Sequence, residues 1–560
     1  MNRLGKKKIV FGLLIVFDLI VLIRFTGCSQ NESIQYMDYN TADEVKTFTF
    51  YNVDGSADSW TNPVAKAITD ATGVALKTEY PVDQSESGIS LMIATSNYPD
   101  IIFAKGDADE LIEVGALIDL SELIDEYGPN IKKLYGDYYE RLTYSAQDPA
   151  IYQLCSSGMT NEIYTTSGTA QIQYAVLEEN DYRIPYTLEE YGEMIKEYKE
   201  KYPEIDGEET IGISLVASDW RWIITLSNPS GYIANGSQDN GQWIIDDANG
   251  YKATYKHLAE GQKAYFQWMN RMYQEGLLDA EFATQTYEDY LEKISSGRVL
   301  GIMDSNWSYN NAVRSLKQEG KYDRTYASLP VTMDEDMVCA SLNNIVLSIG
   351  WGIGITTACE DPVKAIQFLD YICSEEGQIL IQWGIEGVNY LVDEEGKRYR
   401  TKDEIQKADH DNDYSLSTGV GQYTYPFPRY STGVTDNTGN PFSTDTKQST
   451  IDRYHIAEKK ALDAWGVSML TDIFPQADEF EAPAYAPIWS MYLPSEFKQK
   501  ISVLDNIAWS GLVTCVICSE DEFDEKWESF QNALIDAGAL EMGTYLTEQV
   551  QKQVDFWTKK

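Results

Sequence analysis

Histidine and basic side chains are scarce in this 560-residue sequence. It has three histidines, and its 44 lysines and arginines face 88 aspartates and glutamates, for a formal net charge of −44. Binding to a phosphate backbone needs clustered lysine and arginine, so the balance excludes a nucleic-acid partner. Three histidines leave little room for histidine-based catalysis or a His-rich metal site. The sequence also contains no Gly-x-Ser-x-Gly, His-Glu-x-x-His or P-loop motif, so the usual signatures of hydrolases and nucleotide-binding proteins are missing.

Cysteine is also sparse, with seven in the whole chain. Apart from Cys28, the six that remain are too few for this length to predict a disulfide framework. Cys515 and Cys518 form a Cys-x-x-Cys inside the apolar stretch 512–518. A zinc or redox site would need a second pair of ligands or an exposed helix N-terminus, and neither is evident. We therefore interpret these two as buried structural cysteines.

Long apolar runs are absent after the N-terminus. Arg3 and residues 6–8 are basic, residues 9–23 are apolar apart from Asp18, and Cys28 follows a small residue. This is the layout of a secretory signal, and the cysteine resembles that of a bacterial lipobox. We expect residues 1–27 to be a lipoprotein signal peptide, Cys28 to be lipidated, and 28–40 to be a linker. An uncleaved N-terminal anchor is the alternative, although 15 residues fall short of the ~20 of a spanning helix.

The hydrophobic pattern of the remaining chain is typical of an α/β protein. We expect strands at 45–53, 74–80, 101–104, 211–215 and 299–303. We expect helices at 62–71, 88–95, 187–198, 287–294 and 523–534, at 545–556, and from Pro362 to Ile372. Asn62-Pro63 is a helix start and Gly73 a helix stop, and Thr187 to Glu190 spells a capping box. The polar, turn-rich region 392–450 predicts an excursion rather than a third core.

Aromatic residues are plentiful, with 39 tyrosines and 13 tryptophans. They predict either a large core or a surface that stacks on flat ligands. A pyranose ring has an apolar C–H face and a rim of hydroxyls. Aromatic rings can cover the face while carboxylates and amides bind the rim, so the composition suits a sugar, although it does not exclude a peptide.

A series of segments resembles one known family. Each is short, but they occur in that family's order behind the lipobox-like cysteine. They are Ala71–Val74, Ala94–Ile102, Gly115–Leu120, Ile151–Leu154, Gly297–Met303 and Gly384–Val388. On these residues the chain resembles extracellular solute-binding lipoproteins of bacterial carbohydrate ABC importers, of the type related to maltose-binding protein.

The resemblance implies an α/β fold of two periplasmic-binding-protein-like lobes with a hinge and an interlobe ligand cleft. Lobe one would comprise 41–155 and 328–390, and lobe two 156–327 and 391–560. The implied function is capture of an oligosaccharide at the extracellular face of the cell membrane and delivery to the permease subunits of an ABC transporter. We expect a lipid-anchored monomer without enzymatic activity, cofactor or metal.

In this family the cleft is lined by loops at the ends of sheet strands. The residues that the resemblance brings forward are Asp54 and Trp60 after the first strand, Trp222 after the strand at 211–215, Asp304 and Trp307 after the strand at 299–303, and Trp351 near a hinge crossing. Core packing is the alternative for each tryptophan. Trp220, Trp489 and Tyr492 are weaker candidates, and the sequence does not place the last two.

Other functions stay open at this point. A secreted carbohydrate-active enzyme needs two nearby carboxylates, a requirement that 88 acidic residues cannot test. A glycan- or peptide-binding sensor component that serves a receptor kinase would share the fold. Asp409 to Asp413 begins like a calcium loop, but Tyr414 stands where that loop has glycine and Val420 where it has an acid, so a solvated acidic turn is the ordinary interpretation.

Overall fold

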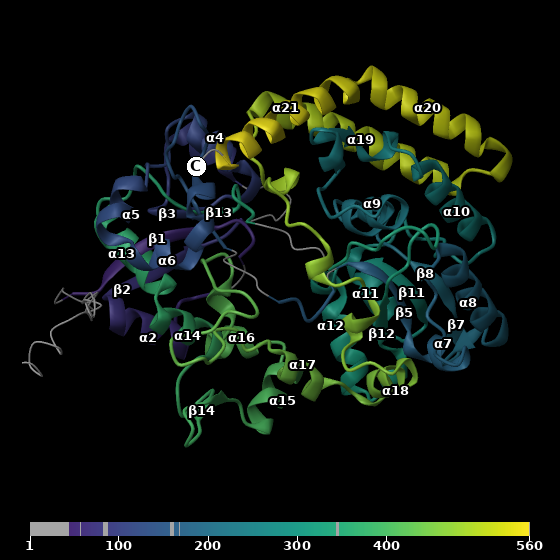
Figure 1. The fold of residues 1–560 in the computed structure, drawn as a ribbon, viewed down its shortest axis with the longest axis horizontal. Helices are drawn as coiled ribbons and strands as arrows, with labels where there is room; N and C mark the ends of the chain where they lie inside the picture. The colour runs from purple at the N-terminus through teal and green to yellow at the C-terminus, as the bar shows by residue number, and fades with distance from the viewer. Residues whose placement is uncertain are drawn as a thin grey trace, which may run out of the picture.

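The computed structural model describes residues 44–55, 58–81, 88–156, 162–166, 168–342 and 347–558. These residues form two α/β lobes, each built on its own sheet, with three long helices along one edge of the molecule (Figure 1). The predicted signal peptide, Cys28 and the linker 28–40 lie outside the described residues.

Lobe one is built on a five-stranded sheet in the order β2-β1-β3-β13-β4. The strands are β1 (Lys46–Asn52), β2 (Val74–Glu79), β3 (Ile101–Phe103), β4 (Leu154–Cys155) and β13 (Gly352–Ile355). β1 lies parallel to both β2 and β3, with Tyr51 opposite Ile102, and β13 runs antiparallel to β3. The carboxyl ends of β1 and β3 therefore meet at one edge of the sheet.

Seven helices belong to this lobe among the described residues. They are α2 (Pro63–Thr72), α3 (Ile89–Thr95), α4 (Ala108–Glu113), α5 (Ser121–Tyr127), α6 (Pro129–Tyr135), α13 (Pro362–Cys373) and α14 (Glu375–Trp383). The predicted start and stop of α2 are confirmed. The Asn62 side chain accepts a hydrogen bond from the Ala65 N–H, and Gly73 takes the left-handed conformation that ends many helices.

Lobe two is built on a four-stranded sheet in the order β12-β5-β11-β8. The strands are β5 (Thr169–Gln173), β8 (Ile211–Ser214), β11 (Val299–Asp304) and β12 (Tyr326–Leu329). β11 is parallel to β8 and antiparallel to β5. In β11, Gly301 is required because a Cβ there would collide with the Tyr191 hydroxyl.

The helices of lobe two are α7 (Tyr174–Glu179), α8 (Leu188–Lys201), α9 (Asn228–Asn235), α10 (Gln262–Gln274), α11 (Tyr287–Ser295) and α12 (Asn306–Gln318). Two small hairpins accompany them, β6 (Glu204–Ile205) with β7 (Glu208–Glu209) and β9 (Trp243–Asp246) with β10 (Lys252–Tyr255). The predicted capping box at the start of α8 is confirmed, because Thr187 and Glu190 each bind the other's backbone N–H.

The later chain departs from the predicted lobe boundaries in two places. β12 (Tyr326–Leu329) lies wholly in the sheet of lobe two, although the boundary was expected within it. Residues 414–430 pack on lobe one rather than lobe two, since the Tyr423 ring packs at a tilt against Trp60 and the Gly421 N–H donates to the Ile381 carbonyl. The reason is long-range: aromatic side chains of a polar, turn-rich segment complete the core of a lobe formed mainly by much earlier residues.

The elements of this region are short. They are β14 (Leu391–Val392), β15 (Arg398–Tyr399), α15 (Lys402–His410), α16 (Tyr414–Thr418), the 3₁₀ turn η7 (Gln422–Thr424), α17 (Lys447–Arg453) and α18 (Ile456–Trp465). α15 lies beside α12 of lobe two, and α18 packs on α7 of the same lobe. The region thus runs from one lobe to the other.

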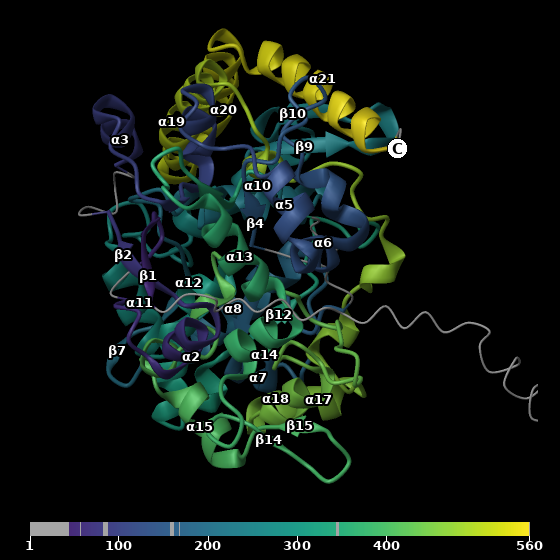
Figure 2. The same cartoon turned by 90° about the vertical axis from the view of Figure 1, so that its left-hand side faces the viewer.

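Three long helices end the chain: α19 (Ser495–Ile517), α20 (Phe523–Asp536) and α21 (Ala539–Thr558). The sequence pattern does not predict α19 as one helix. In two views turned by 90° these helices lie at the same edge of the molecule, far from α15 and α18 (Figures 1 and 2). Among the described residues only α19 is long and apolar enough to cross a membrane; here it packs against α10 and α20, and Trp509 stacks on Trp222.

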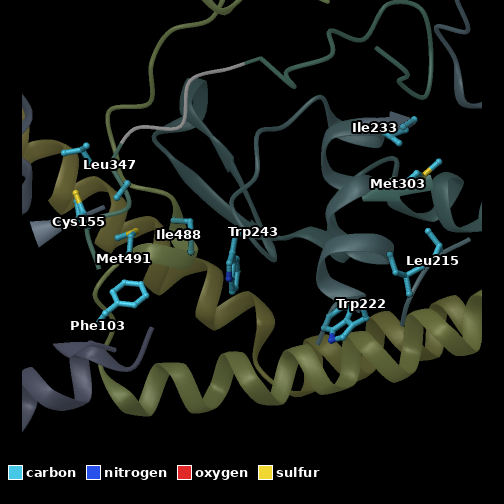
Figure 3. Packing of buried hydrophobic residues seen from close by; sticks show 14 of the residues in the cluster. Phe103, Cys155, Leu215, Trp222, Ile233, Trp243, Met303, Leu347, Ile488 and Met491 are labelled. Atoms are coloured by element: carbon cyan, nitrogen blue, oxygen red, sulfur yellow. The ribbon is translucent and has the colours of Figure 1, made fainter. Parts of the chain in front are cut away.

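One hydrophobic core runs through both lobes. Figure 3 shows Phe103, Cys155 and Met491 on one side, Leu215, Trp222 and Met303 on the other, and Ile488 and Trp243 between them. The interpretation of Cys515 as a buried structural cysteine is confirmed, and Cys518 is half-buried; both are free thiols. The lobes are therefore joined by packed side chains as well as by the crossing chain segments.

Candidate ligand-binding cleft

The carboxyl ends of the strands position the first candidate side chains. Asp54 follows β1, Lys105 follows β3, and Asp304 ends β11, with Trp307 in the first turn of α12. In open α/β sheets, ligands bind beyond the carboxyl ends of strands, at the point where the strand order reverses. Lobe one has such a point between β1 and β3. The next strand along the chain, β2, lies on one side of β1, and the strand after it, β3, lies on the other side.

A large interlobe cavity lies between residues of the two lobes. Its volume is about 1070 Å³, which suits a ligand of several rings, since small-molecule pockets measure roughly 300–1,000 Å³. One wall is a face of α12 together with β12 and α18 of lobe two. The other wall comes from α14, η7 and residues 429–432, packed on lobe one, and α15 adds Asp409 and His410. We call this space the interlobe cavity.

Tyrosines and small polar side chains dominate the interlobe cavity. The tyrosines are Tyr164, Tyr309, Tyr322, Tyr326, Tyr430 and Tyr454. The amide and hydroxyl side chains include Asn306, Asn310, Thr166, Ser328, Gln382 and Thr424. Phenol rings cover apolar C–H surface at a small entropy cost, and amides and hydroxyls both donate and accept hydrogen bonds. The lining is therefore suited to a polyhydroxylated ligand with flat faces.

His455 and Glu458 begin α18 at the cavity wall. Burial, together with the charges of Lys317 and Lys459, lowers the pKa of His455 to about 3, so this histidine is neutral at pH 7. Burial also raises the pKa of the Glu458 carboxyl, against the attraction of Lys317. The two side chains cap α18 through each other's backbone N–H groups, so their positions are fixed by the helix that they start.

Asp54 and Trp351, both candidates from the sequence, are brought together by Lys105. The Lys105 ammonium lies 2.8 Å from an Asp54 carboxylate oxygen and 4.7 Å from the centre of the Trp351 ring. The Tyr425 hydroxyl donates to Asp54 at 2.6 Å. We call these four residues the Asp54 cluster. Tyr425 directly follows Thr424 of the interlobe cavity, so the cluster lies next to the cavity wall in lobe one.

The Asp54 cluster also reaches lobe two. The Trp351 ring packs edge-on against Trp489 at 4.6 Å, and the Trp489 N–H donates to the carbonyl of Asp239, which follows α9. A smaller cavity of about 210 Å³ lies here, lined by Lys105, Trp351 and Trp489 among others. These contacts link the lobes at the base of the cleft.

Trp307 stands exposed and stacks on a second exposed tryptophan, Trp220. Their side chains are 58 % and 52 % exposed, and the rings are nearly parallel, 6.1 Å apart. The Arg221 guanidinium lies 5.0 Å from the Trp220 ring and 3.7 Å from that of Tyr287, and pairs with Asp219. We call Trp220 and Trp307 the tryptophan pair. Asn306, next to Trp307, lines the interlobe cavity.

Trp60, Trp222 and Asp304 do not present their side chains to the cleft surface in this structure. Trp60 packs in the core of lobe one between Phe368 and Tyr423, and Trp222 is buried against α19. Asp304 is 1 % exposed. Much later segments of the chain cover Trp60 and Trp222, whereas Asp304, the last residue of β11, is enclosed by Tyr290 of α11 and the turn that starts α12.

Asp304 acts instead as a buried support for the loop that carries Trp307. Its carboxylate accepts hydrogen bonds from the Tyr290 hydroxyl at 3.0 Å and the Ser305 N–H at 2.7 Å. Burial raises the pKa of this carboxyl to about 6, although these bonds, Ser308 and the charge of Arg221 all favour the ionised form. The bonds fix the turn between β11 and α12.

Several residues of the cleft were missed in the sequence. Lys105 follows β3 just as Asp54 follows β1, so the position of the strands was a signal for it. Tyr425 and Arg429 had no such signal, because they lie in the polar excursion that the sequence did not place. Within the described residues no group of three or more His, Cys, Asp or Glu is arranged to hold a metal ion. In the acidic turn at 409–413, Asn412 accepts a hydrogen bond from Arg314.

The chain is similar to known proteins in both sequence and fold. Residues 64–388 match the family model described as bacterial extracellular solute-binding protein. An uncharacterised protein of Niallia circulans is 25 % identical over 166 residues, 29 % of this chain and 61 % of that protein. Lipoprotein LipO of Bacillus subtilis is 21 % identical over 490 residues, 82 % of this chain and 87 % of LipO.

The fructooligosaccharide ABC transporter substrate-binding protein FusA of Streptococcus pneumoniae matches in both respects. Its sequence is 23 % identical over 284 residues, 48 % of this chain and 49 % of FusA. Its structure in complex with kestose superimposes with a TM-score of 0.63 at 15 % identity, covering 92 % of this chain and 99 % of that one. At this identity the likeness concerns the fold, and it confirms the predicted two-lobe α/β architecture.

Proposed function

The chain belongs to the bacterial extracellular solute-binding protein family, and from that premise we propose that it captures an oligosaccharide in the interlobe cavity and delivers it to the permease of an ABC transporter. The observation that carries the proposal is the cavity itself. It takes its walls from both lobes and is lined by six tyrosines and many amide and hydroxyl groups. The similarity to FusA, whose structure was solved with kestose, points to the same ligand class.

In the proposed complex, aromatic side chains contact the faces of the sugar rings, and amide and hydroxyl side chains bind the hydroxyls at their rims. The tryptophan pair offers about half of each ring to solvent beside Asn306, so it can stack on a ring that extends from the cavity. The half-buried cavity tyrosines Tyr164, Tyr322 and Tyr326 would cover further C–H faces, and Asn310 and Ser328 would bind hydroxyls. Asp54 and Trp351 stay in the proposal as lobe-one contacts at the base of the cleft.

Closure of the lobes would follow from ligand contacts to both walls. A ligand shifts an equilibrium between open and closed forms only by its difference in affinity for the two. A sugar held between α12 and residues 421–432 gains its second wall only when the lobes are together. Hinge closure would then report occupancy to the permease, without chemistry on the sugar.

Anchoring to the outer face of the membrane is part of the proposal. It is supported by the N-terminal layout that ends at Cys28 and by the similarity over 490 residues to a protein named as a lipoprotein. Cys28→Ser should move the protein from the membrane fraction into the medium. Recovery of the variant with the membranes would instead indicate an uncleaved N-terminal anchor.

The experiment that tests the function is a thermal-shift screen of the protein against neutral and acidic oligosaccharides and peptides. A ligand present at 100 times its Kd adds about 2.7 kcal/mol to stability, a readable rise in Tm. We expect a hit on an oligosaccharide that is recovered intact after incubation. Hits on peptides alone, or cleavage of the glycan, would contradict the proposal.

A further inference from the structure

The charges that line the interlobe cavity differ from those of the chain as a whole. The chain has 88 acidic and 44 basic residues, whereas the cavity lining has four basic side chains and three acidic ones. These are Arg314, Lys317, Arg429 and Arg453 against Asp409, Asp445 and Glu458. A protein with a net charge of −44 therefore has more basic than acidic side chains around the interlobe cavity.

Most of that positive charge is not neutralised by the protein. Arg453 pairs with Asp445 at 2.6 Å. Among the described residues, Arg314, Lys317 and Arg429 make no ion pair with a carboxylate: Arg314 donates to the Asn412 side chain and Arg429 to the Thr424 carbonyl. Lys317 lies near Glu458 of α18, since its charge lowers the pKa of that carboxyl against the effect of burial, but the two are not paired at ion-pair distance.

Of these three cations, Arg429 gives the clearest indication that the ligand carries an anionic group. Desolvation lowers the pKa of its guanidinium, and Asp445 is the acid whose charge it feels. Taking a charge out of water without pairing it costs free energy, so an unpaired guanidinium at a cavity wall indicates a partner that arrives with the ligand. A guanidinium presents a planar fork of N–H donors that matches a carboxylate.

The cations stand on opposite walls. Arg314 and Lys317 are one turn apart on the same face of α12 in lobe two, and Arg429 belongs to the segment packed on lobe one. Bringing like charges together opposes closure of the empty cavity. An anion between the walls turns that repulsion into attraction to both sides.

We propose that the ligand is an acidic oligosaccharide, and that its carboxylate is bound between Arg429 on one wall and Arg314 and Lys317 on the other. This inference rests on the proposed function and specifies the ligand class of the same cavity. The anion couples recognition to closure, because only the closed form surrounds it with cations from both lobes.

Isothermal titration calorimetry of the intact protein with matched probes tests this inference. The probes are trigalacturonate with its fully methyl-esterified form, and 3′-sialyllactose with lactose. We expect an acidic probe to bind at least tenfold more tightly than its neutral partner. Its affinity should fall as NaCl rises from 50 to 500 mM, because salt screens exposed charge, whereas neutral binding should not change.

Substitutions test whether the cations of the interlobe cavity, rather than the overall charge of the protein, bind the acidic probe. Arg429→Gln and Lys317→Gln should each weaken binding of the acidic probe at least tenfold and narrow the gap to the neutral one. Arg183→Gln removes an arginine of the loop between α7 and α8 that is paired with Glu190 and does not line the cavity, and it should have no effect. Arg314 is half-buried on the cavity-facing side of α12 and makes no ion pair with a carboxylate, so Arg314→Gln keeps the test valid should Arg429→Gln fail to fold by circular dichroism.

Each outcome has a separate meaning. Tighter binding of the neutral probes, or acidic binding unchanged in the Arg429, Lys317 and Arg314 variants, would overturn this inference and leave the proposed function standing. Failure of every oligosaccharide in the thermal-shift screen, neutral and acidic, would overturn the proposed function as well.

Discussion

At the scale of single residues, Trp307 and Trp60 carry the same side chain in opposite surroundings. Trp307 is 58 % exposed and stacks on Trp220, whereas Trp60 is 7 % exposed, packs at a tilt against Tyr423 and donates to Thr69 at 3.0 Å. Exposed aromatic pairs are unfavourable to leave in water unless a ligand covers them. Substitution of Trp307 should therefore affect ligand binding, and substitution of Trp60 should affect the stability of the fold.

Trp307→Ala should weaken oligosaccharide binding by about tenfold or more, which is about 1.4 kcal/mol, and change the free energy of unfolding by less than about 0.5 kcal/mol. Trp60→Ala is the matched control, and it should lower the free energy of unfolding by about 3–5 kcal/mol. Calorimetric titration and urea unfolding measure the two effects. Wild-type affinity in Trp307→Ala would remove the tryptophan pair from the proposed site.

Asp304 makes the stability of the protein depend on pH. Its pKa is about 6 in the folded protein, raised by burial, and about 3.9 in an unfolded chain. The folded state therefore holds this proton more tightly, so the free energy of unfolding falls as pH rises from about 4 to about 6 and is level above that range. At about 1.4 kcal/mol per pH unit, the contribution is roughly 3 kcal/mol.

Asp304→Asn should remove that contribution. Between pH 4 and 7 the wild-type free energy of unfolding should fall by roughly 3 kcal/mol more than that of the variant, because other titrating groups, Asp505 included, are common to both. Urea titrations at several pH values measure the difference. Asp463→Asn, on the exposed side of α18, should give a curve parallel to the wild type, and a parallel curve for Asp304→Asn would contradict the prediction.

At the scale of elements, the start of α19 is tied to lobe one by a buried carboxylate. Asp109 of α4 accepts from the Leu493 N–H at 2.8 Å and lies 2.7 Å from the Lys498 ammonium. The far end of α19 belongs to lobe two, where Asn270 of α10 donates to the carbonyls of Cys515 and Val516. α19 therefore spans the two lobes and is bonded to each of them.

Lys498→Ala should lower the free energy of unfolding by about 3 kcal/mol, because it leaves the Asp109 carboxylate buried without its counter-charge. Lys500→Ala, two residues along the same helix, removes an exposed lysine 4.0 Å from Glu541 and should cost less than about 0.5 kcal/mol. Urea unfolding followed by tryptophan fluorescence compares the two. Equal effects would show that Asp109 does not depend on Lys498.

At the scale of the whole molecule, two lobes, each built on its own sheet, flank a cavity whose walls come from both lobes. The chain crosses between the lobes after β4, after β12 and again in its C-terminal half. Crossing segments of this kind allow rotation of one lobe against the other while each core stays packed. The continuous core beneath the cleft confines that rotation to a hinge.

Binding should therefore make the protein more compact. The radius of gyration from small-angle X-ray scattering should fall when a bound oligosaccharide is present at 100 times its Kd, while the far-ultraviolet circular dichroism stays constant. A sugar without a thermal shift serves as the control. An unchanged radius with a saturating ligand would contradict closure and favour binding to a preformed cavity.

Local sequence signals were sufficient for most regular elements. Asn62-Pro63 and Gly73 bounded α2, Thr187 and Glu190 started α8, and alternating or continuous apolar runs gave β1, β3 and β11, because capping and burial patterns act over a few residues. Helix α19 was missed because its apolar side chains occur all around it, so its amphipathic period is weak where it packs between α10 and α20.

The sequence by itself determined the α/β class, the order of the strands along the chain and the kinship with solute-binding proteins, since caps, apolar runs and short motifs lie within neighbouring residues. Only the tertiary structure decided which candidates reach the cleft. It buried Trp60 and Asp304 under segments hundreds of residues away or across the sheet, paired Trp307 with Trp220, and brought Arg429 opposite Lys317. Burial and charge pairing depend on long-range contacts, which no local pattern encodes.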